Sequence, residues 1–398
     1  MEQRKEGRRR KKRRKFSQSK RMAAVMFVSM TAFICLINLI TRDKPFSEKE
    51  NRVLEQKPKI TMTGIENGRF MDQYESYKSD QFAGRDLWVF LKTNVDLLLG
   101  KRESNGVFKG KDGYLLEDIA SPDPDQLEEN LKAMVEFSSD HSNVPFYMLL
   151  VPNAANILSD KLPNLAVTED QQEQFEDIKK ALSGEYVWVD AQKVLRKHKD
   201  EEIYYHTDHH WTTLGANYVY QELAKYMELD TSKAPELKPY AVTADFNGTL
   251  SATSGYKSGY KEPIYIYSAK KAKDETEVVV NYTDEQKKTA TLYDRAKLED
   301  RDKYAVFFGG NFSMMDIRTT ADSTDRLLLV KDSYANCLIP FLVPYYREII
   351  VIDPRYYYGD IYQVMEENKI TSVLFLYNGN TFVEDNSISG VLDKHETE

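Results

Sequence analysis

The chain has 398 residues, 41% of them hydrophobic, so it is long enough to fold around a substantial core. Its net charge of −8 is unevenly distributed, because residues 1–21 hold twelve Lys or Arg and two Glu, whereas the remainder holds 43 basic and 61 acidic residues. This separation excludes a simple cytosolic enzyme. The acidic body also excludes nucleic-acid binding by the folded part, since a polyanion is bound by basic surfaces.

An uncharged apolar segment of 20 residues, Met22 to Thr41, separates the basic head from the acidic body. A helix of that length crosses the hydrocarbon core of a bilayer. The basic cluster before it predicts a cytoplasmic tail over residues 1–21 and an exported body, by the positive-inside rule. A cleavable signal peptide is the alternative, but it has a shorter apolar region and a small-residue cleavage site, where this chain has Arg42-Asp-Lys-Pro45. We therefore predict an uncleaved, single-pass anchor.

The two cysteines also bear on the compartment. Cys35 lies in the predicted span and Cys337 in the body, so no disulfide forms within the exported domain. An exported domain without disulfides is typical of the outer face of a bacterial cell membrane, here expected to be Gram-positive. Cys337 falls within an apolar helical pattern, which predicts a buried, unreactive thiol.

The first half of the body alternates helices with buried strands. A polar, proline-containing linker is expected at residues 42–65, followed by a single domain over residues 66–398. Apolar periodicity predicts helices at 66–100, 127–137, 169–182, 191–198 and 213–227, and a turn at 110–113 predicts a hairpin. Continuous apolar runs predict strands at 145–151 and 186–189. This alternation predicts a three-layer α/β sandwich with a mainly parallel sheet.

The second half begins with an interruption. Residues 228–300 are polar and rich in Tyr and Lys, with short β-like pieces at 264–267 and 278–280, which predicts a β-rich insertion. The alternation then resumes with a helix from about Tyr334 and four short apolar strands at 305–308, 326–330, 349–352 and 372–376. Right-handed crossovers make this a doubly wound sheet, whose ligand site lies at the carboxyl ends of the strands.

Three of the six histidines fall within Tyr204-Tyr-His-Thr-Asp-His-His-Trp211. In one interpretation, Asp208 orients the imidazole of His210 and stabilises its protonated form, which makes His210 a base. In the other, His206, Asp208 and His210 project from one face of an extended segment and bind a metal ion. The alternate spacing permits both interpretations. His209 is expected to face away from these residues and to pack.

A serine favours the first interpretation. Ser333 lies in Lys331-Asp-Ser-Tyr-Ala-Asn336, just after a buried apolar run and at the start of a helical pattern. There the hydroxyl is exposed at the carboxyl edge of the sheet, and N–H groups at a helix start can stabilise an oxyanion. An ordinary helix-capping serine is the alternative. Because the same chain carries the His-Asp pair, we predict a triad in the order Asp, His, Ser.

These strings resemble the DHHW protein family, which belongs with the alginate O-acetylation proteins in the SGNH-hydrolase-like superfamily. The serine turn and the DHHW string together are specific. Weaker likenesses extend the resemblance over nearly all of the body, at Phe46-Ser-Glu-Lys-Glu-Asn-Arg52, Asp80-Gln-Phe-Ala-Gly-Arg85, Phe308-Gly-Gly-Asn311 and Tyr377-Asn378.

The resemblance implies an acyl-transfer site with Ser333 as nucleophile, His210 as base and Asp208 as its orienting partner. It also suggests candidates for binding the oxyanion or the substrate: Arg355, Tyr377, Asn378, Asn311 and Trp211. Two departures from the superfamily are present. Lys331 replaces the first Gly of the usual Gly-Asp-Ser turn, and the serine follows the Asp-His pair, as it does in the alginate-acetylation branch.

The resemblance implies O-acetylation of a cell-surface polysaccharide through an acyl-serine intermediate, with no cofactor or metal. Because acetyl-CoA is absent outside the membrane, the expected acyl donor is a multi-pass membrane O-acyltransferase. A carbohydrate esterase is one alternative, since water and a sugar hydroxyl compete for the same acyl-enzyme. A non-catalytic scaffold for polysaccharide assembly is the other.

Overall fold

The computed structural model describes residues 2–47, 52–256 and 258–394, and the chain divides into two compact units, Met1–Val95 and Asp96–Glu398. The second unit thus begins within the domain predicted at residues 66–398. In the first unit, the helices bond to the segment predicted as a linker: the Tyr77 hydroxyl donates to Asp43, and the Gln81 amide donates to the carbonyl of Lys44. Residues 48–51 of the motif at 46–52 lie outside the described residues.

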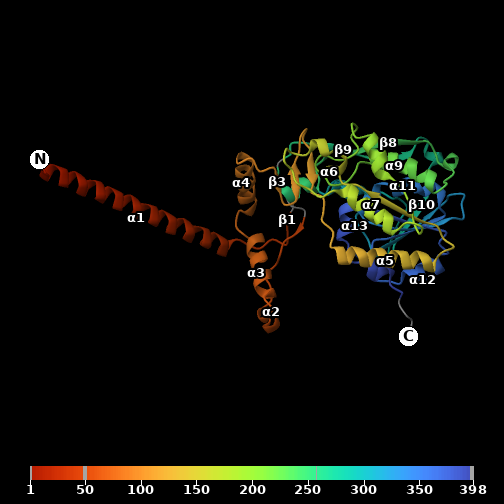
Figure 1. Ribbon diagram of the computed structural model, residues 1–398, viewed down its shortest axis with the longest axis horizontal. Helices are drawn as coiled ribbons and strands as arrows, with labels where there is room; N and C mark the ends of the chain where they lie inside the picture. Colours follow the sequence, from red (N-terminus) through yellow and green to blue (C-terminus); the bar gives the residue numbers. More distant parts are fainter. Residues whose placement is uncertain (1, 48–51, 257, 395–398) are drawn as a thin grey trace. The chain divides into compact units, whose positions relative to one another are not determined.

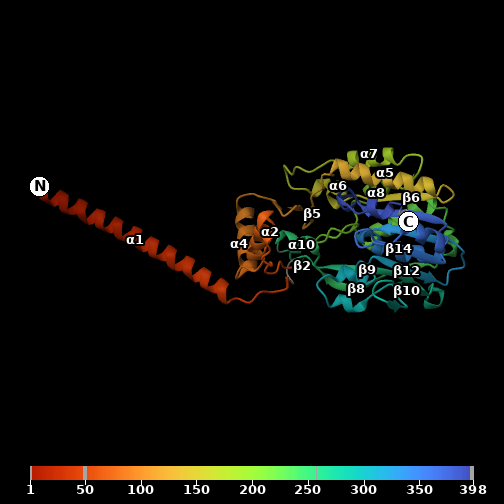
Figure 2. The ribbon, with the colours of Figure 1, turned by 90° about the horizontal axis from the view of Figure 1, so that it is seen from below.

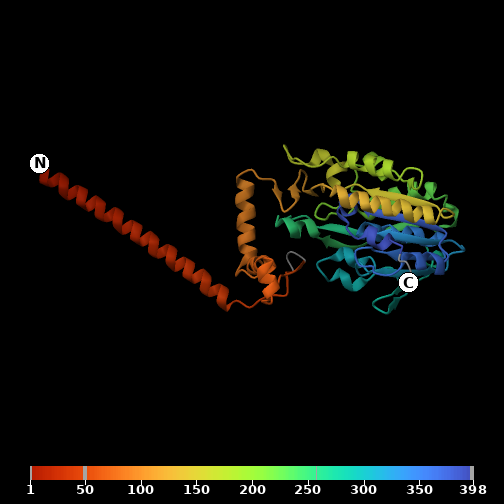
Figure 3. The same ribbon diagram turned by 60° about the horizontal axis from the view of Figure 1, so that its bottom comes forward.

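The first unit begins with a long helix, α1 (Glu2–Ile40), which Figure 3 shows in red as one uninterrupted helix. Its stretch Gln18–Ile40 is long and apolar enough to cross a membrane, and it contains all but the last residue of the predicted span. The polar side chains of Thr31 and Asn38 donate to the carbonyls of Phe27 and Ile34, four residues back. These bonds satisfy groups that would be costly to leave unpaired in hydrocarbon.

The remainder of the first unit is partly regular, unlike the linker expected at 42–65. Strand β1 (Phe46–Ser47) pairs antiparallel with β2 (Arg52–Val53). Three helices follow, of which the last runs three residues past the unit boundary: α2 (Met62–Glu66), α3 (Arg69–Asp80) and α4 (Arg85–Leu98).

The second unit is built on an eight-stranded sheet in the order β11-β10-β12-β14-β13-β15-β6-β7, part of which Figure 2 shows in succession from β6 to β10. The five strands from β14 to β7 are parallel to one another: β14 (Glu348–Ile352), β13 (Arg326–Lys331), β15 (Ser372–Asn378), β6 (Phe146–Val151) and β7 (Val187–Trp188). The other three are antiparallel: β12 (Met314–Thr319), β10 (Val278–Tyr282) and β11 (Lys287–Thr289).

Both faces of this sheet are buried, which is why its strands read as continuous apolar runs. Along β13, Leu327 and Leu329 pack into one core, and Leu328 and Val330 pack into the other. The second core is covered by α5 (Pro124–Asp140), α7 (Gln171–Ala181), α12 (Ile361–Glu367), α13 (Gly379–Glu384) and α14 (Ile388–Leu392). The first is covered by α6 (Ala154–Ile157), α8 (Ala191–Lys197), α9 (Thr213–Tyr226) and α11 (Ile339–Leu342). Figure 1 shows α5 and α12 on one side of the unit and α9 on the other, which confirms the three-layer sandwich.

The predicted insertion at 228–300 is only partly separate from the sheet. Strands β8 (Leu237–Phe246) and β9 (Glu262–Ala269) form their own antiparallel pair, with α10 (Thr249–Ser254) between them. In contrast, β10 and β11 extend the main sheet, because β10 pairs with β12 over five residues. The predicted hairpin is confirmed by the pairing of β4 (Val107–Lys109) with β5 (Leu115–Glu117), beside β3 (Glu103–Ser104).

In the last third, one predicted element is wrong and a second differs in the kind of helix. Residues 305–308 form no strand: a 3₁₀-helix, η5 (Lys303–Val306), includes the first two of them, and Phe307 makes only an isolated bridge to Tyr293. Val306, Phe307 and Phe308 are all buried in one core, and a short apolar run cannot distinguish such a turn from a strand. The expected helix from Tyr334 is a 3₁₀-helix, η6 (Ser333–Cys337), followed by short segments that begin at or near Pro340 and Pro344.

Candidate active site

The histidine string forms a closed loop rather than the extended segment expected. An isolated antiparallel bridge joins Tyr204 to Trp211, and the N–H of Tyr205 donates to the carbonyl of His210 at 3.3 Å. Immediately after it, Thr212 caps α9, because its hydroxyl accepts from the N–H of Gly215. We call residues 204–211 the base loop.

Ser333 is placed by the sheet. It follows β13 directly and begins η6, at the carboxyl edge where the parallel strands end. The buried Asp332 carboxylate accepts from the N–H of Tyr334 at 2.9 Å and from the N–H of Asn378, at the end of β15, at 3.0 Å. Asp332 thus fixes the turn to two neighbouring strands. We call residues 331–336 the serine turn.

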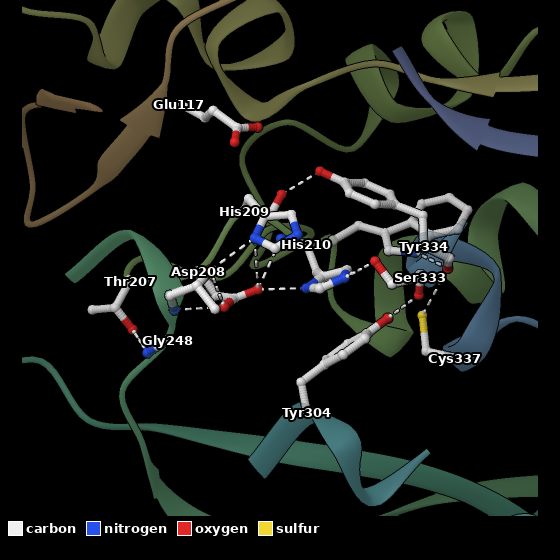
Figure 4. A network of polar contacts seen from close by, with 12 residues as sticks. Glu117, Thr207, Asp208, His209, His210, Gly248, Tyr304, Ser333, Tyr334 and Cys337 are labelled. Carbon is white, nitrogen blue, oxygen red and sulfur yellow. Dashed lines mark hydrogen bonds and ion pairs between the residues drawn. The ribbon is translucent and has the colours of Figure 1, made fainter. Parts of the chain in front are cut away.

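The base loop and the serine turn meet in a hydrogen-bonded series, drawn in Figure 4. His210 Nδ1 lies 2.6 Å from Asp208 Oδ1, and His210 Nε2 lies 2.8 Å from Ser333 Oγ. An ionised carboxylate only accepts, so Nδ1 carries the proton and Nε2 is left to accept from the serine hydroxyl. This arrangement can remove the Ser333 proton and so turn a weak nucleophile into an active one.

The Asp208 carboxylate is buried and fully engaged. Oδ1 accepts from the N–H and Nδ1–H of His210, and Oδ2 accepts from the N–H of Thr249 at 2.8 Å and its hydroxyl at 3.0 Å. Burial alone would raise the pKa of Asp208, but the adjacent His209 and His210 rings and the hydrogen bonds from His210 and Thr249 outweigh it. The pKa is therefore well below the ordinary range, and Asp208 stays ionised.

Gly248 permits the approach of Asp208. A Cβ at this position would overlap Cβ and Oδ2 of Asp208 and would lie 2.7 Å from its Cα. The Gly248 N–H also donates to the Thr207 hydroxyl at 2.9 Å. Any other residue at position 248 would push Asp208 out of place.

A second buried carboxylate holds the base loop from outside the triad. Glu262 on β9 accepts from the N–H of His206 at 2.9 Å, from the N–H of Thr207 at 3.1 Å and from the Thr207 hydroxyl at 3.0 Å. It also accepts from His206 Nδ1 at 3.1 Å, and the His206 ring is stacked between Tyr114 and Tyr260. The metal interpretation required His206 to lie with Asp208 and His210. Instead, the His206 side chain is bonded to Glu262.

His209 does not face away as expected. The centroid of its ring lies 3.9 Å from that of the His210 ring, and its Nδ1 lies 2.8 Å from the Thr249 hydroxyl. Ligand atoms of Asp208, His209 and His210 lie within 4.8 Å of one another, close enough to share a cation. Both ring nitrogens of His210 are already hydrogen-bonded in the triad, so this cluster fits proton transfer better than metal binding.

Aromatic side chains complete the site. The ring of Tyr304, from η5, is stacked on the imidazole of His210 with the ring centroids 3.8 Å apart. The Tyr304 hydroxyl donates to the Ser333 carbonyl at 3.3 Å. The Tyr334 hydroxyl donates to the His209 carbonyl, and the Trp211 indole donates to the Tyr334 carbonyl at 2.9 Å. These bonds tie the serine turn to the base loop independently of the triad.

The remaining predicted candidates fall into two groups. Trp211 and Tyr377 are fully buried, and Tyr377 packs into the core on the α5 side of the sheet, so neither can touch a substrate. Asn378 is also buried, and its amide donates to Asn153 at 3.0 Å. Arg355 and Asn311 reach the surface: Arg355 is 30% exposed and bonds to Asp353 through two nitrogens, whereas Asn311 Oδ1 accepts from Lys331 and Asn336.

Four residues of the site were not predicted: Gly248, Thr249, Glu262 and Tyr304. Glu262 is a single carboxylate in a region without a motif. Tyr304 is one of 26 tyrosines and also lies outside any motif. Gly248 and Thr249 stand in a polar stretch where a glycine reads as an ordinary turn. The available signal was their position in the segment that interrupts the α/β alternation just after the histidine string.

The sequence and the fold of this chain resemble those of known proteins. Residues 129–352, more than half of the chain, match the DHHW protein family. The fold is similar to that of a DHHW family protein from Eubacterium siraeum, with a TM-score of 0.60 and 23% identity over 72% of this chain and 95% of that one. It is also similar to Bacillus cereus PatB1 with a sulfonyl adduct, with a TM-score of 0.59 and 23% identity over 70% and 97% of the two chains. These neighbours confirm the fold class.

A curated relative extends the comparison. The chain is 26% identical to the probable alginate O-acetylase AlgJ of Pseudomonas aeruginosa over 168 residues, which are 40% of this chain. The match spans 43% of the length of AlgJ. The expected relation to the alginate O-acetylation proteins is confirmed, and the family match extends from α5 through the base loop and serine turn to the end of β14. The chain belongs to the DHHW protein family.

Proposed function

We propose that this chain is a membrane-anchored serine O-acyltransferase that acetylates a cell-surface polysaccharide. The observation that carries the proposal is the unbroken hydrogen-bonded series from Asp208 through His210 to Ser333. A serine in such a series is activated for attack on an ester. The name of the relative AlgJ, a probable alginate O-acetylase, supports acetyl as the acyl group and a polysaccharide as its acceptor.

In the first half-reaction, Ser333 Oγ attacks the carbonyl carbon of an acyl ester while its proton passes to His210 Nε2. Asp208, which stays ionised, stabilises the imidazolium that forms. The tetrahedral intermediate collapses when the bond to the donor oxygen breaks, and His210 returns the proton to that oxygen. The products are the acyl-serine and the free donor alcohol.

In the second half-reaction, a sugar hydroxyl attacks the acyl-serine and gives its proton to His210 Nε2. The bond from the acyl carbon to Ser333 Oγ then breaks, and the proton returns to Oγ. The acyl group has moved from donor to sugar with no net change in the enzyme. Water in place of the sugar would give hydrolysis, so the exclusion of water by the acceptor decides between transferase and esterase.

Two surface residues are assigned to the reacting carbonyl and the glycan. Ser333 and Arg355 each lie three residues past the register pair Val330 and Ile352, on adjacent parallel strands, so both stand at the same edge of the sheet. Because Asn311 Oδ1 is engaged by Lys331 and Asn336, its amide N–H is the group that can donate to a substrate oxygen. We assign donation to the oxyanion or glycan to Asn311 and Arg355.

The compartment determines the donor. We assign residues 1–21 to the cytoplasm, the apolar part of α1 to the membrane and the rest of the chain to the outside, which has no acetyl-CoA. A multi-pass membrane O-acyltransferase is therefore assigned as the partner that delivers the acyl group. The apolar length of α1 and the basic residues before it support this topology.

The test uses the full chain in detergent micelles with p-nitrophenyl acetate as donor and an oligosaccharide as acceptor. We expect ester cleavage that needs Ser333, and acetyl groups on the sugar in proportion to the acceptor supplied. Unchanged cleavage by Ser333→Ala would overturn the serine mechanism. Serine-dependent release of acetate with no acetylated sugar, for any glycan of the host envelope, would assign the chain as an esterase instead.

A further inference from the structure

The described part of the first unit exposes many large apolar side chains that lie outside α1. A few such side chains are normal on a soluble surface, but a dense set marks an interaction site. They lie on the short ladder, on the segment before α2, and on α2 to α4: Phe46, Val53, Ile60, Met62, Ile65, Met71, Tyr74, Phe82, Leu87, Trp88, Leu91 and Val95.

Helix α4 shows the most ordered part of this set. Leu87, Leu91 and Val95 are spaced four residues apart, so they form one stripe, and Trp88 widens it. Their exposed fractions are 58%, 44%, 51% and 48% in that order. We call these four residues the α4 stripe. The opposite side of the helix holds the buried Thr93, so the stripe is a second apolar face rather than the inner one.

The start of α4 is bonded to the end of the apolar helix. The N–H of Ala83 donates to Asn38 Oδ1 at 2.9 Å, two residues before α1 ends. A hollow of about 440 Å³ next to this bond is lined by Thr41 and Arg42 and also by Phe82 and Arg85. Helix α4 therefore begins at the level where the apolar helix ends.

The residues at that level suit a membrane interface. Phe82 and Trp88 form an edge-to-face pair with ring centroids 6.4 Å apart, and tryptophan concentrates at the boundary between lipid and water. The charged residues of α4 balance, with Arg85 and Lys92 against Asp86 and Asp96. A contact made by this helix is therefore apolar rather than electrostatic.

We propose that α4 is an interfacial helix whose stripe is buried in the outer leaflet of the bilayer, as a second membrane contact beside α1. This rests on the assignment of α1 as a membrane span under the proposed function. Covering the stripe with lipid removes apolar surface from water close to the point where the chain leaves the membrane.

The test reconstitutes the full chain in nanodiscs of phosphatidylcholine with or without bromine on the acyl chains. Bromine quenches only tryptophans near the lipid. The chain has three tryptophans, of which Trp211 is fully buried and Trp188 half-buried in the second unit. We expect brominated lipid to quench the wild type, and Trp88→Phe to lose most of that quenching. High salt should leave the quenching unchanged.

Two matched variants complete the design. Leu91→Glu should reduce the quenching, whereas Val167→Glu, which replaces an 87% exposed residue of the second unit, should not. Equal quenching of wild type and Trp88→Phe would overturn the proposal, as would efficient crosslinking of Leu91→Cys to a second copy without quenching. Extraction of the full chain from membranes by carbonate would instead refute the span itself, so the two failures are distinguishable.

Discussion

The serine turn and the base loop are positioned by different means. The serine turn is held by the main sheet, since β13 and β15 pair with each other and Asp332 accepts from the N–H of Tyr334, just after β13, and from the N–H of Asn378, at the end of β15. The base loop has one isolated bridge of its own and belongs to no sheet. It is held by the N–H groups of Leu115 and Ser251 and by the side chains of Thr249, Glu262 and Tyr304. The difference teaches that the nucleophile is placed by the sheet, whereas the base is placed by contacts with several separate segments and is the easier half to displace.

The largest expected effect comes from removing either half of the triad. Ser333→Ala and His210→Ala should each lower kcat/KM by at least ~10³-fold, because the two residues act as one unit. The double variant should lose no more than the worse single variant. Additive losses, measured by ester turnover of the full chain, would show that the two halves act independently.

Displacing the base without touching the triad should have the next largest effect. Gly248→Ala forces Asp208 away from His210, and a shift of about 1 Å can lower kcat ~10²-fold. Gly390→Ala is the matched control, since its added methyl meets no atom within 4 Å, and it should keep full activity. An active Gly248→Ala enzyme would mean that the base loop tolerates movement that the geometry forbids.

Weakening the contacts that Glu262 makes with the base loop should lower activity less than displacing Asp208 does. Glu262→Gln removes the charge that accepts from His206 and Thr207, and hydrogen bonds to a buried charge are worth ~2 kcal/mol each. We expect a lower melting temperature and a ~10-fold lower kcat. Glu236→Gln loses only an exposed pairing with Lys270 and should change neither quantity. Thermal melts and turnover of the two variants check this.

The base loop also predicts a pH dependence of stability. The folded state lowers the pKa of Asp208 below its unfolded value of about 3.9, so ionised Asp208 stabilises the fold above that pH. The contribution is lost as the pH falls from there towards the folded pKa. Urea midpoints at pH 6 and pH 3 should therefore differ less for Asp208→Asn than for the wild type. An equal or larger difference would contradict the lowered pKa.

The smallest effect is expected at the contact that links the two halves through Tyr304. Tyr304→Phe keeps the ring on His210 and removes only the bond from the hydroxyl to the Ser333 carbonyl, which is long at 3.3 Å. Turnover should fall by less than ~5-fold, in keeping with about 0.5–1 kcal/mol. Tyr304→Leu, which also removes the ring, should fall further. If the two variants are equally active, the stacking on His210 has no role.

The same contrast explains what the sequence could predict. Strands β6, β13, β14 and β15 are buried on both faces, so their apolar runs identify them, and Ser333 follows from the end of β13. The pairing of Asp208 with His210 is local, two residues apart. The contacts of Thr249 and Glu262 with the base loop cross 41 and 56 residues, and no periodic pattern reports such a contact.

Residues 305–308 show a second limit on what the sequence can predict. Their apolar side chains are buried as predicted, but they belong to a turn beside the site rather than to a strand. That turn brings Tyr304 onto His210. A strand at this position would have placed the ring elsewhere, so the error in the predicted element also hid a residue of the site.

The central claim is that an acyl group passes through Ser333, and trapping that intermediate tests it most directly. The full chain is mixed with p-nitrophenyl acetate, quenched in acid, digested and analysed by mass spectrometry. The account predicts one acetyl group on the peptide that contains Ser333, absent from Ser333→Ala and from His210→Ala. Acetyl on another residue at the same occupancy, or turnover by Ser333→Ala with no labelled peptide, would contradict it.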